Sequence, residues 1–415
     1  MGQIDSGIAA LDTSLKLRRD IRDWQGEADC LQELGIIHHL AGSHALALQH
    51  LRGALSIVEK SNDKASSSTI NMHIGKIHRA TMKHADAVQA LKSARDSGLE
   101  AERAGIWSFF GGWAAKAECL NEYALALSDV RDAACVEMFK DVADEWLRRS
   151  DVQKAALAMI ECARSAFKMP ASSRASHLLL VSSQLQHCLV ICRSSKFESC
   201  KAIEAECLYL SGLSNELQGS CRAAAPLFRQ ASSMYETQGD KQGQARALLH
   251  FGTVCLSLQK RSSLLAEAVD ALTRSLQLRQ ELQDVEGSFD CSIAIVRAVL
   301  YNGSALSIIT PPQTTSTQDD YFKTSVAKAI PALKDSVMSV STAEQAALRA
   351  AAICQSMCVL SHAHCVIGSV AAGFQFAQDA LQSAQRQGDP KLQAAAELEM
   401  ARCLLYADDC QVASL

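Results

Sequence analysis

The residues with the clearest potential for chemistry form a cluster in the stretch CQSMCVLSHAHC. It contains Cys354, Cys358, His362 and Cys365 at helical spacing, and thiolate and imidazole are ligands that Zn²⁺ binds readily. A helix rises 1.5 Å per residue, so Cys354 and Cys365 would lie roughly 16 Å apart, too far for one tetrahedral ion. A zinc site built on Cys354 and Cys358 with ligands from elsewhere is left open. The interpretation that we favour is small core residues between helices, with no metal bound.

Nucleophilic and acid–base chemistry has no support in the spacing of the histidines. His38, His39, His78 and His250 stand near glycines, where half-buried packing residues are the simpler interpretation. The sequence also contains no phosphate-binding loop and none of the motifs Gly-x-Gly-x-x-Gly, His-Glu-x-x-His or Gly-x-Ser-x-Gly. We therefore expect that the protein is not an enzyme and takes no cofactor.

Composition predicts a folded protein of the cell interior. Of its 415 residues, 48% are hydrophobic and 21% are charged. The formal net charge is -4, so the chain lacks the excess of basic residues that is typical of nucleic-acid-binding proteins. The N-terminus lacks the apolar core of a signal peptide, and no apolar run reaches the roughly 18 residues of a membrane span. The 16 cysteines, Cys188 and Cys192 included, are therefore expected to be reduced and to pack as small apolar residues. We expect a cytoplasmic protein.

The elements that position these residues follow from a pattern that recurs along the chain. The stretches ALDTSLKLRRDIRD, from Ala10, and ALTRSLQLRQELQD, from Ala271, agree at seven of fourteen positions. A wider search finds Gly-x11-Ala-x3-(Leu/Phe)-x2-Ala three times, with a period near 40 residues. The copies are Gly35, Ala47, Leu51 and Ala54; Gly75, Ala87, Leu91 and Ala94; and Gly212, Ala224, Phe228 and Ala231.

This spacing predicts pairs of antiparallel helices. Small residues at fixed points let the two helices approach closely, and the larger apolar residue fills the gap between them. An aspartate nine residues after the last small residue caps the next helix by accepting hydrogen bonds from its free N–H groups. These caps are Asp23, Asp63, Asp240, Asp284 and Asp389. After Gly252 the pattern arrives four residues late, at Ala268, Leu272 and Ser275, which indicates an insertion near KRSSLL.

The small residues and the period resemble the tetratricopeptide repeat family, with the longer repeats of kinesin light chains and Pins-type cortical adaptors as the nearest parallel. The resemblance implies an all-α fold, a right-handed α-solenoid of about eight tetratricopeptide-like helix-turn-helix pairs. A further copy at Trp113, Ala114, Ala126, Val130 and Ala133 is expected where the pattern is degenerate. The residues that carry the resemblance are Gly35, Ala47, Ala54, Gly75, Ala87, Ala94, Gly212, Ala224, Ala231 and Gly252.

This fold divides the chain into consecutive groups of repeats. Pro311 and Pro312, followed by a run of Thr, Ser and Gln, interrupt the pattern and predict a flexible loop inside one repeat. The expected parts are a half-repeat cap helix at 1–22, two clear repeats at 23–99, degenerate helical repeats at 100–197, clear repeats at 198–300, the loop at 301–322, C-terminal helical repeats at 323–388, and a terminal cap helix and tail at 389–415.

The resemblance also implies where a partner would bind. In the family, residues that flank the glycine of each first helix line the concave face and contact ligands. By register these residues are Gln32, Ile36, His39, Met72, Lys76, Arg79, Tyr209, Leu213, Glu216, Arg246, Leu249 and Thr253. This mixed and partly apolar surface suits an amphipathic helix or an extended segment. The predicted function is a non-catalytic scaffold or adaptor, or a structural subunit of a larger intracellular assembly such as a cytoskeletal complex. Its expected partners are other proteins and not nucleic acid.

An alternative function starts from the first residues, MGQIDS, which fit the myristoylation pattern and would place an acyl chain on Gly2. The basic residues Lys16, Arg18, Arg19 and Arg22 could add a second membrane signal. The protein would then resemble rapsyn-like scaffolds, although we expect no counterpart of their zinc-binding RING domain. Contact with a membrane is expected only if Gly2 is acylated. A metal-binding protein is the remaining alternative.

Overall fold

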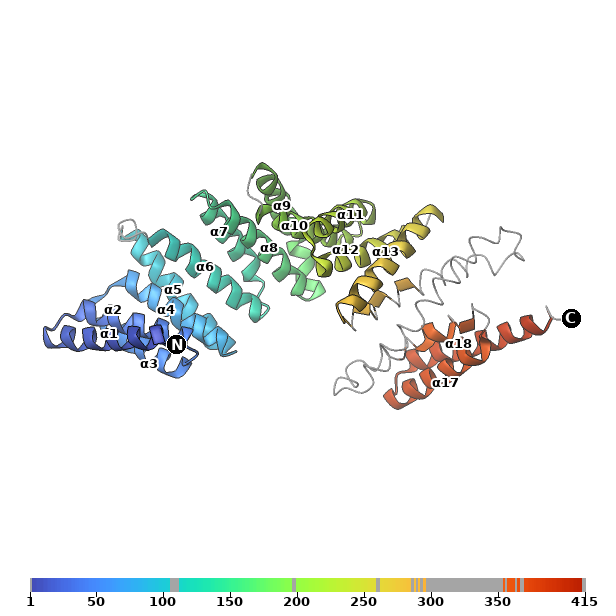
Figure 1. Cartoon of the computed structure of the whole chain (residues 1–415), viewed down its shortest axis with the longest axis horizontal. Coiled ribbons are helices and arrows are strands. Elements are labelled where there is room, and N and C mark those ends of the chain that lie inside the picture. The colour runs from blue at the N-terminus through green and yellow to red at the C-terminus, as the bar shows by residue number, and fades with distance from the viewer. Residues whose placement is uncertain are drawn as a thin grey trace. The chain divides into compact units, whose positions relative to one another are not determined.

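The protein is built from helices that pack in consecutive pairs (Figure 1). The computed structural model describes residues 2–104, 112–195, 199–258, 262–284, 287, 288, 290, 291, 294, 295, 354, 357–362, 364, 365 and 369–412. Within these ranges every regular element is a helix, so the expected all-α class is confirmed. The loop expected at 301–322 lies outside the described residues.

The chain divides into two units, Met1–Leu210 and Ser211–Leu415. In unit 1, each helix from α1 to α8 packs against the next one along the chain, so that the series ends with α9. These helices are α1 Gly2–Asp20, α2 Trp24–Leu40, α3 His44–Ser61, α4 Lys64–Ala80, α5 His84–Arg103, α6 Gly112–Asp129, α7 Ala134–Leu147, α8 Val152–Lys168 and α9 Ala171–Ser194.

Unit 2 continues the same alternation after α10, which runs from Ser199 to Leu217 and so begins in unit 1. Helix α12 packs against both α11 and α13, and α17 packs against α18. The helices are α11 Cys221–Gln238, α12 Lys241–Ser257, α13 Ser262–Glu281, α17 Val370–Gln387 and α18 Pro390–Val412. By the repeat pattern, α2, α4, α6, α8, α10, α12 and α18 are first helices, and α1, α3, α5, α7, α9, α11, α13 and α17 are second helices.

The predicted aspartate caps begin the first helices. Asp23 Oδ1 accepts a hydrogen bond from the Gly26 N–H at 3.0 Å, and Asp240 Oδ1 accepts one from the Gly243 N–H at 2.9 Å. Asp63, Asp284 and Asp389 accept from backbone N–H groups in the same way. Each cap satisfies an N–H group that has no partner inside its helix, which stabilises a helix by about 1 kcal/mol. All five predicted caps are confirmed.

The two similar stretches that begin at Ala10 and Ala271 end in the same local structure. Arg18 Nη1 donates to Asp23 Oδ2 at 3.0 Å, and Arg279 Nη1 donates to Asp284 Oδ2 at 2.9 Å. The guanidinium therefore holds the capping carboxylate from one side while the first turn of the next helix holds it from the other. The shared residues thus build the junction from a second helix to the next first helix.

The glycines mark the points where paired helices are closest. A Cβ atom added at Gly35 would lie 2.6 Å from Leu51 Cγ, and one at Gly75 would lie 2.3 Å from Leu91 Cγ. Gly252 has the same relation to Leu272, at 2.5 Å, so the larger residue is in place despite its late position in the sequence. Real Cβ atoms do not approach this closely, so these positions require glycine. The close-packing role of the repeat pattern and the insertion after Gly252 are both confirmed.

The expected copy of the pattern at 113–133 is wrong. Helix α6 contains both Ala114 and Ala126, whereas the pattern requires them on two paired helices, and Val130 lies in the turn that follows. The turn shows the true register, because Gly42 and Arg131 have positive φ values of 78° and 56° at equivalent places. Gly35 precedes Gly42 by seven residues, and Ala124, which is fully buried, precedes Arg131 by seven. Alanine therefore takes the place of glycine in this repeat.

Helix α9 qualifies the expectation that no segment has the character of a membrane span. By length and composition alone it could cross a membrane, and it is the one helix of the described residues that meets this test. Its Val181, Leu185 and Cys188 side chains are nevertheless fully buried, and α9 packs against α8. A core helix of a soluble protein meets the same test, so the composition of α9 is weak evidence for a membrane.

Candidate partner-binding surface

The predicted binding residues differ in how far solvent can reach them. On α2, the side chains of Gln32, Ile36 and His39 are half-buried and therefore accessible to a partner. Met72 on α4 and Tyr209 on α10 are buried, with only 4% and 7% of their surface exposed. These two side chains pack inside the protein, which corrects their prediction as contact residues. The other predicted residues, Lys76, Arg79, Leu213, Glu216, Arg246, Leu249 and Thr253, are half-buried.

The two predicted cationic contacts on α4 bind acidic side chains of the next first helix. Lys76 Nζ lies 2.7 Å from Glu118 Oε1 on α6. Arg79 Nη1 lies 2.6 Å from Glu122 Oε2, and its Nε lies 2.9 Å from Asp129 Oδ2. Neighbouring first helices are therefore joined by charge-assisted hydrogen bonds, which are stronger than neutral ones. These cations hold two repeats together and are not free to clamp a ligand.

The same bridge recurs further along unit 1. Arg164 on α8 donates to Glu206 on α10 at 2.8 Å and also to Glu161 on its own helix at 2.6 Å. Lys76 and Glu118 are 42 residues apart, and so are Arg164 and Glu206. Lys76 and Arg164 each follow the buried small residue of their helix, Gly75 or Ala163. The bridge is thus a repeated feature of the first helices in unit 1.

Unit 2 contains a related bridge in which the acidic residue stands on the earlier of the two first helices. Here the earlier first helix, α10, supplies the acid, and Glu216 Oε2 lies 3.0 Å from His250 Nδ1 on α12. The predicted contact residue Glu216 therefore also bonds within the protein. Thr253 Oγ1 donates to the His250 backbone carbonyl at 3.0 Å. These side chains remain half-buried, so a partner could reach part of each one.

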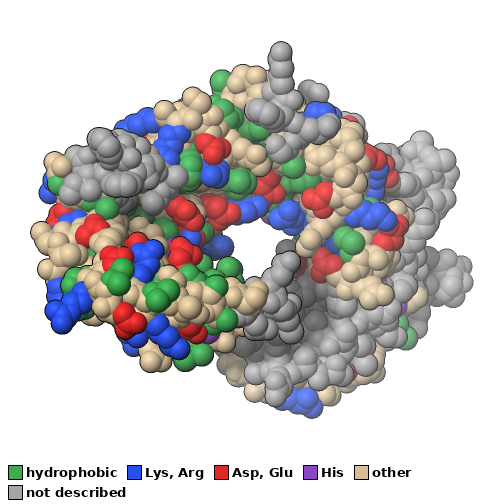
Figure 2. Space-filling model, turned by 60° about the vertical axis from the view of Figure 1, so that its left-hand side comes forward, with side chains coloured by type: hydrophobic (Ala, Val, Ile, Leu, Met, Phe, Trp, Pro, Cys, Tyr) green, Lys and Arg blue, Asp and Glu red, His purple; other side chains and the backbone are tan. Residues whose placement is uncertain are grey.

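The histidines next to the bridges add little positive charge at neutral pH. Burial lowers the pKa of His73 to about 4, and the adjacent Lys76 cation acts in the same direction. Burial also lowers the pKa of His39, helped by His44 and Lys76. Because both imidazoles are neutral near pH 7, acidic groups outnumber basic ones among the bridging side chains of unit 1. Figure 2 shows basic and acidic side chains interspersed on the visible face rather than gathered by sign.

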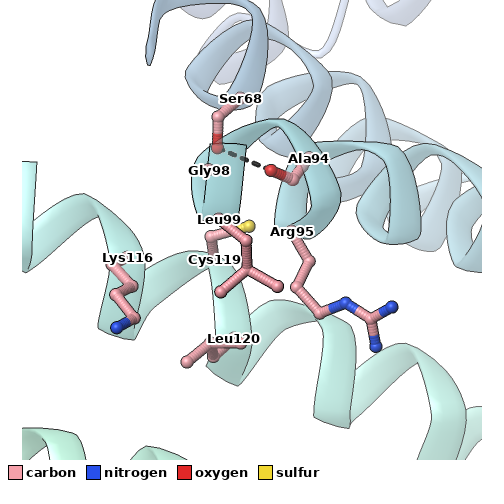
Figure 3. A pocket seen from close by; sticks show the side chains of 8 residues that line it. All are labelled: Ser68, Ala94, Arg95, Gly98, Leu99, Lys116, Cys119 and Leu120. Atoms are coloured by element: carbon pink, nitrogen blue, oxygen red, sulfur yellow. Dashed lines mark hydrogen bonds between the residues drawn. The ribbon is translucent and has the colours of Figure 1, made fainter. Parts of the chain in front are cut away.

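A small pocket lies between α4, α5 and α6 (Figure 3). It encloses about 210 Å³ of empty space, part of it open to solvent. The Ser68 hydroxyl at one side donates to the Ala94 carbonyl at 2.7 Å, and the charged ends of Arg95 and Lys116 point away from Cys119. Burial raises the pKa of the Cys119 thiol to about 12, so it is protonated and a poor nucleophile. The pocket therefore lacks a free polar group that could orient a ligand.

The cysteine cluster near the carboxyl end behaves as part of the core. Cys354 is fully buried and its Sγ lies 3.3 Å from the Ala380 carbonyl oxygen, while burial raises the pKa of Cys358 to about 12. Cys365 Sγ lies 3.2 Å from Cys403 Sγ on α18 rather than beside Cys354. Cys188 and Cys192 are also buried. Among the described residues, no three His, Cys, Asp or Glu side chains are grouped so as to hold a metal ion.

The acidic partners Glu118, Glu122, Asp129 and Glu206 were not predicted from the sequence. Two of them stand 42 residues after their cations, close to one repeat period, and this spacing was the available signal. It could not be used without the register of α6 and α8, whose fully buried small residues are alanines, Ala124 and Ala163. Because alanine stands in place of glycine, the glycine-based pattern found neither these repeats nor the bridges between them.

Known structures agree with this arrangement of helices. The chain is similar to a signal transduction ATPase with numerous domains that carries a tetratricopeptide repeat sensor, from Pyrococcus horikoshii, with a TM-score of 0.54 and 12% identity. The match covers 94% of this chain and 54% of that protein. The fold is of the tetratricopeptide-repeat type. No protein-family model and no curated protein sequence matches the chain.

Two further structures align over most of their length with lower scores. Aspartyl phosphate phosphatase F from Bacillus subtilis has a TM-score of 0.45 and 12% identity, over 91% of this chain and 93% of that one. The quorum sensor NprR from B. thuringiensis, in its apo form, has a TM-score of 0.43 and 11% identity, over 92% and 97%.

Proposed function

We propose that the protein is a non-catalytic scaffold that binds a segment of a partner protein. The binding surface is the first-helix face of unit 1, defined by the residues that follow the buried small residue of each first helix. These residues are Ile36, Lys76, Leu125 and Arg164, and none of their side chains is buried. One observation carries the proposal: apolar and cationic residues alternate at one structural position of four successive first helices, α2, α4, α6 and α8.

The chemistry of this face indicates what the partner segment carries. Ile36 and Leu125 offer apolar contacts, whereas Lys76 and Arg164 are neutralised by Glu118 and Glu206. Half of the Glu118 side chain, 51%, is still exposed. A segment with apolar side chains and some basic or neutral polar groups fits this surface better than an acidic segment, since like charges repel. This favours an amphipathic helix or an extended segment as the bound element.

The structural likeness supports an interaction role at the level of the fold. The tetratricopeptide repeats of the Pyrococcus horikoshii protein are a sensor. The resemblance to kinesin light chains and Pins-type adaptors adds that the partner belongs to an intracellular assembly, with cytoskeletal complexes among the candidates. The raised pKa of the buried thiols supports a role without cysteine catalysis. Acylation of Gly2 stays a prediction, which the mass of the N-terminal peptide would check.

Native affinity purification with mass spectrometry tests the proposal. The double variant Ile36→Glu/Leu125→Glu places charge at two accessible apolar positions. We expect the amount of bound protein to fall at least tenfold. The control is Leu179→Glu on α9, a second-helix position that is 78% exposed, and it should retain all of the bound protein. If the double variant retained its co-purified proteins as well as the control does, the proposal would be contradicted. Sizing of the eluate then separates a fixed subunit, with stoichiometric companions, from an exchanging adaptor.

A further inference from the structure

Two histidines face each other across the turn between α2 and α3. His39 stands in the last turn of α2, and His44 is the first residue of α3. Their Nδ1 atoms are 3.3 Å apart, whereas their ring centroids are 5.2 Å apart and the ring planes are tilted by 45°. The nitrogens are therefore the atoms through which the two rings meet.

The backbone of the turn holds the two histidines in place. Gly42 has a φ of 78°, a conformation that glycine adopts without strain, and its N–H donates to the His39 carbonyl at 3.0 Å. The Ser43 N–H donates to the His38 carbonyl at 2.8 Å. These bonds close the end of α2 and start α3 at a fixed point, so the positions of His39 and His44 follow from the repeat itself.

The separation of the two nitrogens suits a metal ion better than a hydrogen bond. An N–H···O hydrogen bond usually joins heavy atoms about 2.7–3.2 Å apart, so 3.3 Å is long for such a bond. A tetrahedral Zn²⁺ ion binds imidazole nitrogens at about 2.0–2.1 Å, which places two of them about 3.3–3.4 Å from each other. Each neutral imidazole can carry its proton on Nε2, which leaves both Nδ1 lone pairs for the ion.

The charges around the pair permit a cation. Burial, together with His44 and Lys76, lowers the pKa of His39, so its imidazole is neutral as a metal ligand must be. Lys76 is itself paired with Glu118 at 2.7 Å, which offsets its charge. The carbonyl end of α2 favours a cation and the N–H end of α3 opposes it, so the two helix ends act in opposite directions. The two nitrogens then decide whether an ion binds.

We propose that His39 and His44 form a two-histidine site for Zn²⁺ at the turn between α2 and α3. Both side chains are half-buried, so water can reach the ion and complete its coordination. Among the residues that the structure describes, no three donor side chains surround one point, so this is an open site and not a closed structural one. Its ligands are not among the partner-surface residues defined above, and either proposal can fail without the other.

Calorimetric titration of the intact chain with zinc chloride, in a buffer that keeps the thiols reduced, tests the proposal. We expect His39→Gln and His44→Gln, each made alone, to weaken the binding of Zn²⁺ at least tenfold, because one of two ligands is lost. The matched controls are His38→Gln and His50→Gln on the same two helices. Those rings stack face to face, with planes 3° apart, so they do not converge on an ion, and both controls should bind like the unmodified chain.

Thermal unfolding with and without zinc chloride gives a second measurement. An ion that binds only the folded chain stabilises it, so Zn²⁺ should raise the unfolding midpoint of the unmodified chain and of both controls. The midpoints of His39→Gln and His44→Gln should rise much less. An unmodified chain that takes up no Zn²⁺ would overturn the proposal. So would equal affinity in all five proteins, which would place the ion at cysteines that every variant retains, or an equal loss in the controls.

Discussion

Gly75 and Lys76 are neighbours in α4, yet they bind different parts of unit 1 by different physics. Gly75 faces the second helix of its own repeat and admits Leu91 at a distance that leaves no room for a methyl group. Lys76 faces the next first helix and pairs with Glu118. The contact of Gly75 inside its repeat is therefore steric, and the contact of Lys76 with the next first helix is electrostatic. Changing the volume of a buried side chain lowers the free energy of unfolding, whereas an exposed ion pair contributes little to it.

The largest expected effect on stability comes from changing the steric contact between Gly75 and Leu91. Leu91→Ala removes a fully buried side chain and leaves a cavity beside Gly75, so we expect the free energy of unfolding to fall by about 2–5 kcal/mol. Urea denaturation measures the change. Leu46→Ala is the control, because Leu46 is 46% exposed on α3 and its removal should cost far less. A loss at Leu91 no greater than at Leu46 would contradict the close-packed interpretation.

Adding a methyl group at the same contact should have the next largest effect. Gly75→Ala would place a Cβ atom 2.3 Å from Leu91 Cγ, so Leu91 must shift, and we expect a loss of about 1–3 kcal/mol. Gly7→Ala makes the matched change on α1, where the new methyl group meets nothing within 4 Å. There the higher helix propensity of alanine should raise stability by about 0.5–1 kcal/mol. Thermal unfolding of both variants would show opposite signs.

The free energy of unfolding should depend on pH through His73, which lies next to Lys76. Its pKa is lowered from 6.5 to about 4, chiefly by burial, so the unfolded chain binds a proton in this range that the folded chain does not. The stabilising contribution is complete above about pH 6.5 and is lost as the pH falls towards 4. We expect a loss of about 1–2 kcal/mol, because the imidazole is not fully buried. His73→Gln should remove this part of the pH dependence, and an unchanged profile would contradict it.

The smallest effect should come from breaking a bridge between first helices. Arg79→Met removes the cation that pairs with Asp129 and the nearer of the two cations beside Glu122, and we expect the free energy of unfolding to fall by about 1 kcal/mol or less. The double variant with Glu122→Gln should recover part of it, because an unpaired acid is then absent. High salt should shrink the difference between Arg79→Met and the unmodified protein. A loss as large as that of Leu91→Ala would mean that the two kinds of contact do not differ as described.

The same comparison explains how much the sequence could predict. Gly35, Gly75 and the aspartate caps were found because sterics and capping demand particular residue types at fixed spacing. The repeat around α6 was missed because Ala124 fills the glycine position, and alanine is too common in this chain to mark a register. Pairing of Arg79 with Glu122 was not predictable either, since many acids stand at suitable distances along the sequence. Burial of Met72 depends on neighbouring repeats, which no local pattern specifies.

The insertion after Gly252 has a practical consequence for work with this protein. Gly212 and Phe228 are 16 residues apart, whereas Gly252 and Leu272 are 20 apart, and both pairs make the same contact. The connection between paired helices can therefore change length while the helices keep their registration. A short epitope or a fluorophore attachment sequence placed between α12 and α13 should be carried without distorting the repeats on either side. Such a labelled protein would let binding be followed in living cells with both chain termini left untouched.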